Sequence, residues 1–375
     1  MHSLLVLIDG LGDDPIPAWD GATPFEHAQH PTMDRLGAMG IATSFSICED
    51  DIIPESLSCI LRLLGVQKKN IPHNRAYLEL LANNRDISEY EMVLRCNLAA
   101  VDESGTLIAF NGQGLSAAEM EAAARRCDGI LDDIEFIHLS EYRNLLIMDK
   151  ENFVLNCDVQ PPHESMGLKL EQLLRPLLQN SLPVTYFLKE ANKRLRPFAR
   201  RGLRYVLYPW GAAARQQLPS FFSIHGFRGG AVCKAEIVSG MAKALDMEVS
   251  VPVGATGEVD TDIKAKAIAT LKLLEKNTFV ITHFNGTDEA SHRYDYEGKA
   301  DLISTIDSQF LQFIFANYKE PLKVVVCGDH VTSSVTGRHT TGPTPVIAGC
   351  VNFSRLPVSI RSYRDILGFL MKESE

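Results

Sequence analysis

The chain has 375 residues, with 37 Lys and Arg against 47 Asp and Glu, which gives a formal net charge of −10. Its 45% hydrophobic and 22% charged residues are typical of a globular protein and exclude a disordered or collagen-like chain. The acidic balance argues against nucleic acid or an anionic membrane as a partner, because those partners need a basic surface. The length suggests about two domains.

We find no targeting or membrane-spanning segment in the sequence. The apolar run at residues 4–8 is short and ends at Asp9, without the basic flank or cleavage site of a signal peptide. No apolar stretch approaches the roughly 20 residues that cross a bilayer. The eight cysteines are scattered, without close pairs. We therefore expect a reduced, cytoplasmic protein, and the oligomeric state stays open.

Apolar runs that end in polar residues predict buried parallel strands. In chain order these runs are residues 4–8, 204–209, 278–283 and 322–327. Helical patterns lie around and between them, at residues 31–39, 234–246, 262–275 and 298–317. This alternation predicts an α/β fold with a mostly parallel central sheet and helices on both faces.

The middle of the chain has a different pattern. Two predicted hairpins flank a predicted helix, in the order 92–101, 106–110, 116–127, 135–139 and 143–149. This order predicts a smaller α+β domain, at about 90–160, inserted into a core made of 1–90 and 160–375.

Four polar clusters follow the predicted core strands or lie just beyond them. They are Asp9-Gly10, Pro54-Glu55-Ser56, Asn285–His292, and Gly328–His330 with Arg338-His339. Ligands of open α/β sheets bind at the carboxyl ends of the strands, and Asp and His are common ligands of divalent ions. Such a set suits two ions about 3.5–4 Å apart, the arrangement that supports in-line phosphoryl transfer.

Ser56 opens a short predicted helix that ends near Gly65. A serine in this position is often only an N-cap. It is also placed to act as a nucleophile, because metal coordination lowers the hydroxyl pKa and a helix N-terminus stabilises phosphate. The residues alone leave both roles open.

The sequence resembles the cofactor-independent phosphoglycerate mutases of the archaeal type, in the alkaline phosphatase superfamily. The motifs that carry the resemblance are Ile8–Asp13, Thr23–Glu26, Pro31–Leu36, Arg95–Asn97, Gly254–Gly257 with Asp260-Thr261, Gly286–His292, Gly328–His330 and His339–Pro345. The resemblance implies an alkaline-phosphatase-like sandwich with an inserted domain. It also implies a small phosphorylated metabolite as substrate, with interconversion of 3-phosphoglycerate and 2-phosphoglycerate as the expected reaction.

The resemblance implies two divalent ions, with Mn²⁺ expected and Zn²⁺ or Mg²⁺ as alternatives. The residues that match the family's metal ligands are Asp9, Ser56, Asp329 and His330 for one ion, and Asp288, His292 and His339 for the other. Ser56 matches the serine that becomes phosphorylated. The expected substrate-binding residues are Arg75, Arg95, Asn97 and Arg143. Since histidine ligands must be neutral, ion affinity is expected to fall below about pH 6.5.

The chain departs from the family pattern in the substrate shell. Leu57 and Ile60 stand where the family has an acid and a histidine, Ala76-Tyr77 replaces Gly-Pro, and the segment around Trp210 lacks its arginine. These changes keep two alternatives: a phosphatase or phosphotransferase acting on another small metabolite, and a metal-binding relative without turnover. His163 and His283 match no ligand position and are expected to have structural roles.

Overall fold

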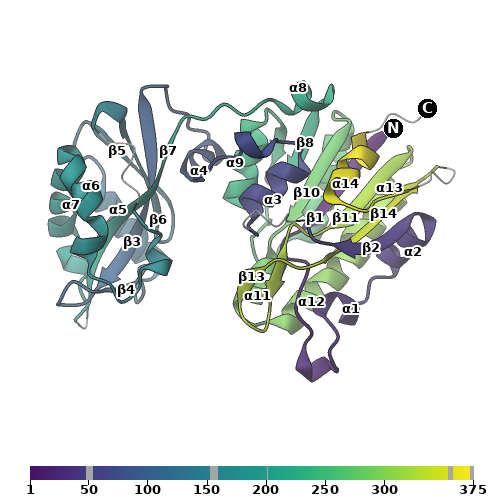
Figure 1. Cartoon of the computed structure of the whole chain (residues 1–375), viewed down its shortest axis with the longest axis horizontal. Coiled ribbons are helices and arrows are strands. Elements are labelled where there is room, and N and C mark those ends of the chain that lie inside the picture. The colour runs from purple at the N-terminus through teal and green to yellow at the C-terminus, as the bar shows by residue number, and fades with distance from the viewer. Residues whose placement is uncertain (48–53, 153–158, 201, 354–357, 372–375) are drawn as a thin grey trace. The chain divides into compact units, whose positions relative to one another are not determined.

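The computed structural model describes residues 1–47, 54–152, 159–200, 202–353 and 358–371. These residues form two compact units, which are described separately (Figure 1). Unit 1 comprises Met1–Ile71 and Leu218–Glu375, and unit 2 is Pro72–Gln217.

Unit 1 is built on a seven-stranded sheet with the order β2-β14-β11-β1-β10-β8-β9. The strands from β11 to β9 are parallel, whereas β14 and β2 run antiparallel at one edge. The bounds are β1 (His2–Ile8), β2 (Ile41–Phe45), β8 (Gly229–Val232), β9 (Glu248–Ser250), β10 (Phe279–Phe284), β11 (Leu322–Cys327) and β14 (Thr344–Val351). The predicted α/β fold with a mostly parallel central sheet is confirmed.

Helices cover both faces of this sheet because its central strands are apolar on both sides. Leu4, Val6 and Ile8 of β1 pack in one cluster with residues of α2, α10 and α12. On the opposite face, the Ser3 hydroxyl donates a hydrogen bond to a backbone carbonyl oxygen of α14. The helices of unit 1 are α1 (Pro24–His27), α2 (Pro31–Met39), α3 (Ser56–Leu63), α8 (Phe221–His225), α9 (Glu236–Ala244), α10 (Ile263–Leu274), α11 (Gly286–His292), α12 (Tyr296–Thr305), α13 (Gln312–Asn317) and α14 (Tyr363–Met371).

The predicted helix at 298–317 is interrupted by a π-helical turn, Ile306–Leu311, between α12 and α13. Within this turn lies Asp307, a buried carboxylate that accepts hydrogen bonds from the backbone N–H groups of Thr32 and Met33. It thereby caps the start of α2, whose own N-cap residue makes no side-chain capping hydrogen bond.

Unit 2 is an α+β unit around a five-stranded sheet, in which β3 lies next to β4, β6 and β7. Helices α5 and α7 contribute to its main core cluster, and α4 packs on the other face of the sheet. The bounds are β3 (Glu91–Val101), β4 (Leu107–Ala109), β5 (Ile134–Ser140), β6 (Arg143–Asp149), β7 (Arg204–Ala214), α4 (Ala76–Ala82), α5 (Ala117–Cys127), α6 (Leu170–Asn180) and α7 (Leu182–Leu195).

One predicted core strand belongs to unit 2 instead. Residues 204–209 form the first half of β7, which pairs antiparallel with β3 rather than joining the parallel sheet. An apolar run suits a central strand of either sheet, because both are covered by helices. Unit 2 is also longer than the expected insert at 90–160. Helix α4 precedes that range, and α6, α7 and β7 follow it.

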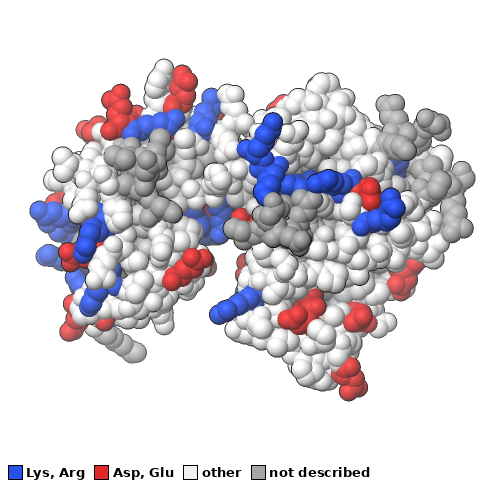
Figure 2. Space-filling model, in the orientation of Figure 1, with Lys and Arg blue, Asp and Glu red and all other residues white. Residues whose placement is uncertain are grey.

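Side chains of both signs occur on the face of each unit that Figure 2 draws. Among the described residues, no helix has both the length and the apolar character that a membrane crossing requires.

Candidate active site

Unit 1 gathers the seven predicted metal ligands where β1, β10 and β11 end. The segments come together because the carboxyl ends of parallel strands meet at one edge of a sheet. The seven are Asp9 after β1, Ser56 at the start of α3, Asp288 and His292 in α11, Asp329 and His330 after β11, and His339 on β13 (Arg338–Thr340), which pairs with β12 (Val331–Ser333).

The first ligand cluster surrounds Ser56. Its Oγ lies 3.4 Å from both carboxylate oxygens of Asp9 and 3.3 Å from Nε2 of His330. The same Nε2 lies 3.4 Å from Asp9 Oδ1 and 3.4 Å from Asp329 Oδ2. Ligands about 2.0–2.2 Å from a tetrahedral ion are themselves about 3.3–3.6 Å apart. The spacing of these atoms therefore suits one shared cation.

The second cluster is formed by Asp288, His292 and His339. Nε2 of His292 lies 3.3 Å from Asp288 Oδ2, and Nε2 of His339 lies 3.3 Å from Asp288 Oδ1. The two imidazole Nε2 atoms are 3.1 Å apart. The rings of His330 and His339 stack with centroids 4.1 Å apart, so the two clusters are adjacent.

The histidines of the second cluster point their Nε2 atoms at each other. Nδ1 of His292 lies 2.9 Å from the carbonyl oxygen of Gly337, and Nδ1 of His339 lies 2.9 Å from that of Pro54. A carbonyl only accepts, so each Nδ1 carries a proton, and each ring, when neutral, has a lone pair on Nε2. Two such lone pairs repel each other unless a cation or a proton lies between them. The donor set therefore fits a divalent ion.

Three carboxylates reinforce this need for positive charge. Burial, and then the neighbouring Asp329 and Asp288, raise the pKa of Asp9 well above its usual range. Burial also acts to raise the pKa of Asp288, but hydrogen bonds from His292 and His339 outweigh it and hold that pKa well below its usual range. Since an uncompensated buried charge is costly, divalent cations would stabilise this group of carboxylates.

We predict that affinity for an ion at the second cluster rises with pH up to about 9. The hydrogen bond with Asp288, the main cause, raises the pKa of His292 to about 9, so an ion arriving below this pH must displace a proton. Affinity should fall about tenfold for each pH unit below that value. The fall begins above the pH of about 6.5 expected from unperturbed histidines, because of the Asp288 contact.

Calorimetric titration of the metal-free protein with Mn²⁺ checks this prediction. At neutral pH, in buffers of different ionisation enthalpy, binding should release about one proton for the ion at this cluster. Binding without proton release would contradict it.

Ser56 is not an N-cap. The N-cap of α3 is Glu55, whose side chain makes no capping hydrogen bond, and Ser56 is the first helical residue. Its hydroxyl contacts Asp9 and His330 instead. Of the two roles that the sequence left open, this geometry favours the nucleophile.

Three functional contacts were missed from the sequence. The first is His283, whose Nε2 lies 2.9 Å from Asp9 Oδ2. Burial lowers the pKa of His283 to about 3, so the neutral ring donates Nε2–H to Asp9. The sequence signal for this contact is a histidine near the end of the mostly apolar strand β10.

The second missed contact is Thr332, whose hydroxyl reaches a ligand in each cluster. The third is the fully buried ion pair between Lys299 Nζ and Asp13 Oδ2, at 2.7 Å. Lys299 also donates to the carbonyl oxygens of Gly12 and Thr332, each at 3.0 Å. It therefore ties the segment after Asp9 to the segment after His330.

The four expected substrate residues share one face of the unit 2 sheet. Arg95 and Asn97 are two residues apart on β3, so their side chains point to the same face of the sheet. Arg143 on β6 pairs with Asn97. Arg75 precedes α4, which packs on this face, and its Nε lies 3.6 Å from Glu79 Oε1. The expected residues thus form one cluster within the unit.

Arg95 is held tightly in this cluster. Its Nε donates to Glu79 Oε2 at 3.0 Å, and its guanidinium lies 4.2 Å from the ring centroid of Trp210. Trp210 in turn donates to Asn97 Oδ1 at 2.9 Å, while the Asn97 amide donates to the carbonyl oxygen of Phe110. Among the described residues, Nη1 and Nη2 of Arg95 have no hydrogen-bond partner. The guanidinium is therefore fixed in place with two donor groups available.

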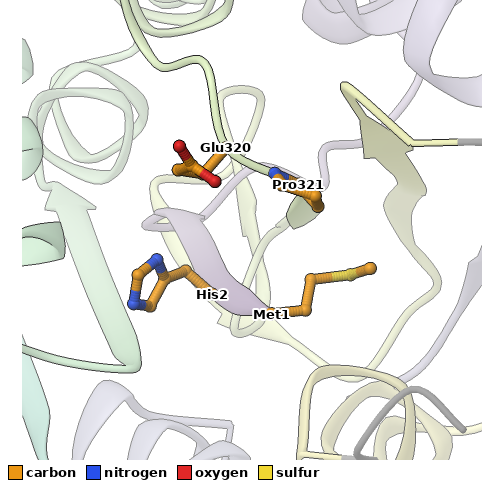
Figure 3. Close-up of a pocket in the computed structure, with 4 residues that line it drawn as sticks. All are labelled: Met1, His2, Glu320 and Pro321. Atoms are coloured by element: carbon orange, nitrogen blue, oxygen red, sulfur yellow. The ribbon is translucent and has the colours of Figure 1, made fainter.

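A pocket of about 360 Å³ lies elsewhere in unit 1 and is lined by Met1, His2, Glu320 and Pro321 (Figure 3). It is formed where β1 and β11 begin, whereas the ligand clusters lie where these strands end. His2 and Glu320 are its two titratable side chains, too few for a metal centre.

Comparisons with known proteins agree with this architecture. 2,3-Bisphosphoglycerate-independent phosphoglycerate mutase 1 of Methanocaldococcus jannaschii is 29% identical over 362 residues, or 92% of this chain and 87% of the relative. The 2,3-bisphosphoglycerate-independent phosphoglycerate mutase of Ignicoccus hospitalis is 29% identical over 369 residues, or 92% of this chain and 88% of the relative.

Two solved structures share the fold. The PH0037 protein of Pyrococcus horikoshii matches with a TM-score of 0.75 and 23% identity, over 98% of this chain and 92% of that one. The cofactor-independent phosphoglycerate mutase of Thermoplasma acidophilum matches with a TM-score of 0.62 and 20% identity, over 99% and 98%. The sequence signature of the Metalloenzyme superfamily matches residues 1–359. The chain therefore belongs to the Metalloenzyme superfamily.

Proposed function

We propose that this chain is a metal-dependent phosphoryl-transfer enzyme that interconverts 3-phosphoglycerate and 2-phosphoglycerate through a phosphoserine at Ser56. The observation that carries the proposal is the position of the Ser56 hydroxyl, within 3.4 Å of Asp9 and His330 at the start of α3. The substrate is proposed from the relatives, which are phosphoglycerate mutases similar to this chain over nearly its whole length. In this role the enzyme would act in glycolysis, in the cytoplasm.

Two divalent ions, with manganese as the proposed metal, would occupy the two ligand clusters. The mixture of carboxylate and imidazole ligands supports a borderline or hard ion. When bound, the ions would lower the pKa of the Ser56 hydroxyl and offset the charge of the transferred phosphoryl group.

The proposed phosphoryl transfer takes place at Ser56, at the start of α3. The Ser56 Oγ–phosphorus bond would form as the bond from phosphorus to the C3 oxygen breaks. The Ser56 hydroxyl loses one proton in this step and the C3 oxygen of glycerate takes up one, so the step balances. The backbone N–H groups in the first turn of α3 have no intrahelical acceptor, and Glu55 does not cap them, so they are available to stabilise the phosphoryl oxygens. Return of the phosphoryl group to the C2 oxygen restores Ser56.

A phosphatase acting on another small metabolite is the second candidate. It is favoured by Leu57 and Ile60, which are buried apolar side chains where the related mutases have an acid and a histidine. The ligand clusters would be unchanged, but water rather than a glycerate hydroxyl would accept the phosphoryl group. A binding protein without turnover is less well supported, because residues that match all seven expected ligands are present and lie close together in unit 1.

The experiment that tests the proposal compares two substrates on one Mn²⁺-loaded preparation. Proton and phosphorus NMR should show 2-phosphoglycerate forming from 3-phosphoglycerate, and chelation should stop the conversion. Release of nitrophenol from p-nitrophenyl phosphate without any mutase activity would instead support the phosphatase. If neither product forms with added metal, the chain does not catalyse phosphoryl transfer.

The cluster of Arg75, Arg95, Asn97 and Arg143 is proposed to bind the substrate anion. Arg95 is the strongest candidate, because its Nη1 and Nη2 groups suit a bidentate contact with a carboxylate or phosphate. Asn97 has both ends of its amide engaged and would act by holding Trp210 against Arg95.

We predict that Arg95→Lys lowers kcat/KM by about tenfold or more, mainly through KM. Lysine keeps the charge beside the buried Glu79 carboxylate but loses the planar fork, so the protein should remain folded. Steady-state kinetics measure the effect. Arg85→Lys is the matched control, because Arg85 pairs with Glu135 on the exposed surface of the same unit. An unchanged KM in Arg95→Lys would remove Arg95 from the substrate site.

A further inference from the structure

Thr332 is the one described side chain whose hydroxyl bonds a ligand of each cluster. Its Oγ1 lies 2.6 Å from Asp288 Oδ1, in the second cluster, and 3.1 Å from His330 Nδ1, in the first. The residue is fully buried on β12, opposite His339 in the pairing of β12 with β13.

The hydrogen bonds around Thr332 can be assigned by counting protons. An ionised carboxylate only accepts, so the single hydroxyl proton is donated to Asp288. Toward His330 the hydroxyl oxygen can then only accept, which requires the proton of the neutral ring to be on Nδ1. Nε2 of His330 is left unprotonated, and this is the atom that lies 3.3 Å from Ser56 Oγ.

In their neutral, metal-binding form, His292 and His339 have the same tautomer for a different reason. Their Nδ1 atoms donate to backbone carbonyls, which no substitution of a side chain removes. Only the tautomer of His330 depends on a side chain, and that side chain also holds Asp288.

The surrounding backbone is shaped to admit this hydroxyl. Gly10 has a φ of +62°, and a Cβ on it would lie 2.6 Å from Thr332 Oγ1 and 2.9 Å from Asp288 Oδ1. The backbone of Thr332 is fixed as well, because its N–H donates to the Gly12 carbonyl and its own carbonyl accepts from Lys299. The backbone that carries the hydroxyl is therefore held in place, and Gly10 leaves room for the hydroxyl beside Asp288.

We infer that Thr332 is a positioning residue that sets the geometry of both metal half-sites at once, by orienting Asp288 in one and selecting the metal-binding tautomer of His330 in the other. This inference rests on the metal site of the proposed function. It predicts that loss of one hydroxyl weakens both ion-binding steps, although Thr332 itself is not a ligand.

The test is calorimetric titration of the metal-free full chain with Mn²⁺ alone. Thr332→Val keeps the shape but removes the hydroxyl, and each binding step should weaken by about tenfold or more, as is typical when a group that orients a metal ligand is lost. Thr332→Ser keeps the hydroxyl and should restore both steps to within about threefold of the wild type. The matched control is Thr336→Val, the same substitution at an exposed position in the turn after β12, and it should bind as the wild type does.

A second readout reports the tautomer directly. Long-range proton–nitrogen NMR of metal-free, histidine-labelled protein should show His330 protonated on Nδ1 in the wild type and in Thr332→Ser. In Thr332→Val the Nε2-protonated form should become populated. A structural role alone would not change this spectrum.

The outcomes separate this inference from the proposed function. Normal binding of both ions by Thr332→Val, or weakening of one step only, overturns the role of Thr332, as does a wild-type chain that binds no Mn²⁺. If both steps weaken in Thr332→Val while the wild type converts no phosphoglycerate, the inference stands and the proposed reaction fails.

Discussion

Replacing Ser56 with Ala is expected to lower kcat for phosphoryl transfer by about 10⁴-fold or more, because the group that accepts the phosphoryl is removed. Among the described residues, Ser56 is the one whose hydroxyl contacts the side chains of both Asp9 and His330. Steady-state assays with 3-phosphoglycerate and with p-nitrophenyl phosphate measure the loss, and it should appear in both if both reactions pass through Ser56.

Ser58→Ala is the matched control for this substitution. Ser58 is also in α3, is partly exposed, and has its hydroxyl 3.4 Å from Glu55 rather than from a metal ligand. It should keep nearly full activity. The Mn²⁺ content of Ser56→Ala should be measured as well, because Ser56 is itself an expected ligand. Residual activity near that of the wild type would contradict the role of Ser56.

Replacing Lys299 with Met is expected to lower the free energy of unfolding by about 3–5 kcal/mol. Both partners of the Lys299–Asp13 pair have fully buried side chains, so the substitution leaves a carboxylate in the core without its cation. Burial lowers the pKa of Lys299, although the neighbouring Asp13 acts in the opposite direction. Denaturant unfolding of the metal-free protein measures the effect.

Two further variants identify the cause of this loss. Lys299→Met combined with Asp13→Asn should regain part of the stability, because no unpaired charge remains. Lys264→Met removes an exposed lysine from α10 and should change stability by less than about 0.5 kcal/mol. If Lys299→Met unfolds at the same denaturant concentration as the wild type, the buried pair does not hold these loops.

The parallel sheet could be predicted because its strands are apolar on both faces and end in polar residues. The strands at residues 4–8, 278–283 and 322–327 are confirmed as β1, β10 and β11. The run at 204–209 fits the same pattern, yet it pairs with β3 in unit 2. An apolar pattern indicates that a strand is buried, but it does not identify the strand with which it pairs. With β7 assigned to the parallel sheet, the predicted insert ended too early.

The ligand residues could be predicted because they follow strand ends in a recognisable order. The side chains that orient them could not. His283, Thr332 and Lys299 contact residues more than 30 positions away or hold a neighbouring loop, and no local spacing indicates such partners. Arg95 is expected at the substrate, but its stacking on Trp210 depends on the pairing of β3 with β7, and its bond to Glu79 depends on the packing of α4 on the sheet.

The measurement that tests the central claim most directly is mass spectrometry of the metal-loaded enzyme, quenched rapidly during turnover of 3-phosphoglycerate. The account predicts a phosphate on the peptide that contains Ser56, present during turnover, lost when substrate is exhausted, and absent from Ser56→Ala. Conversion to 2-phosphoglycerate with Ser56 unmodified at every time point would contradict it.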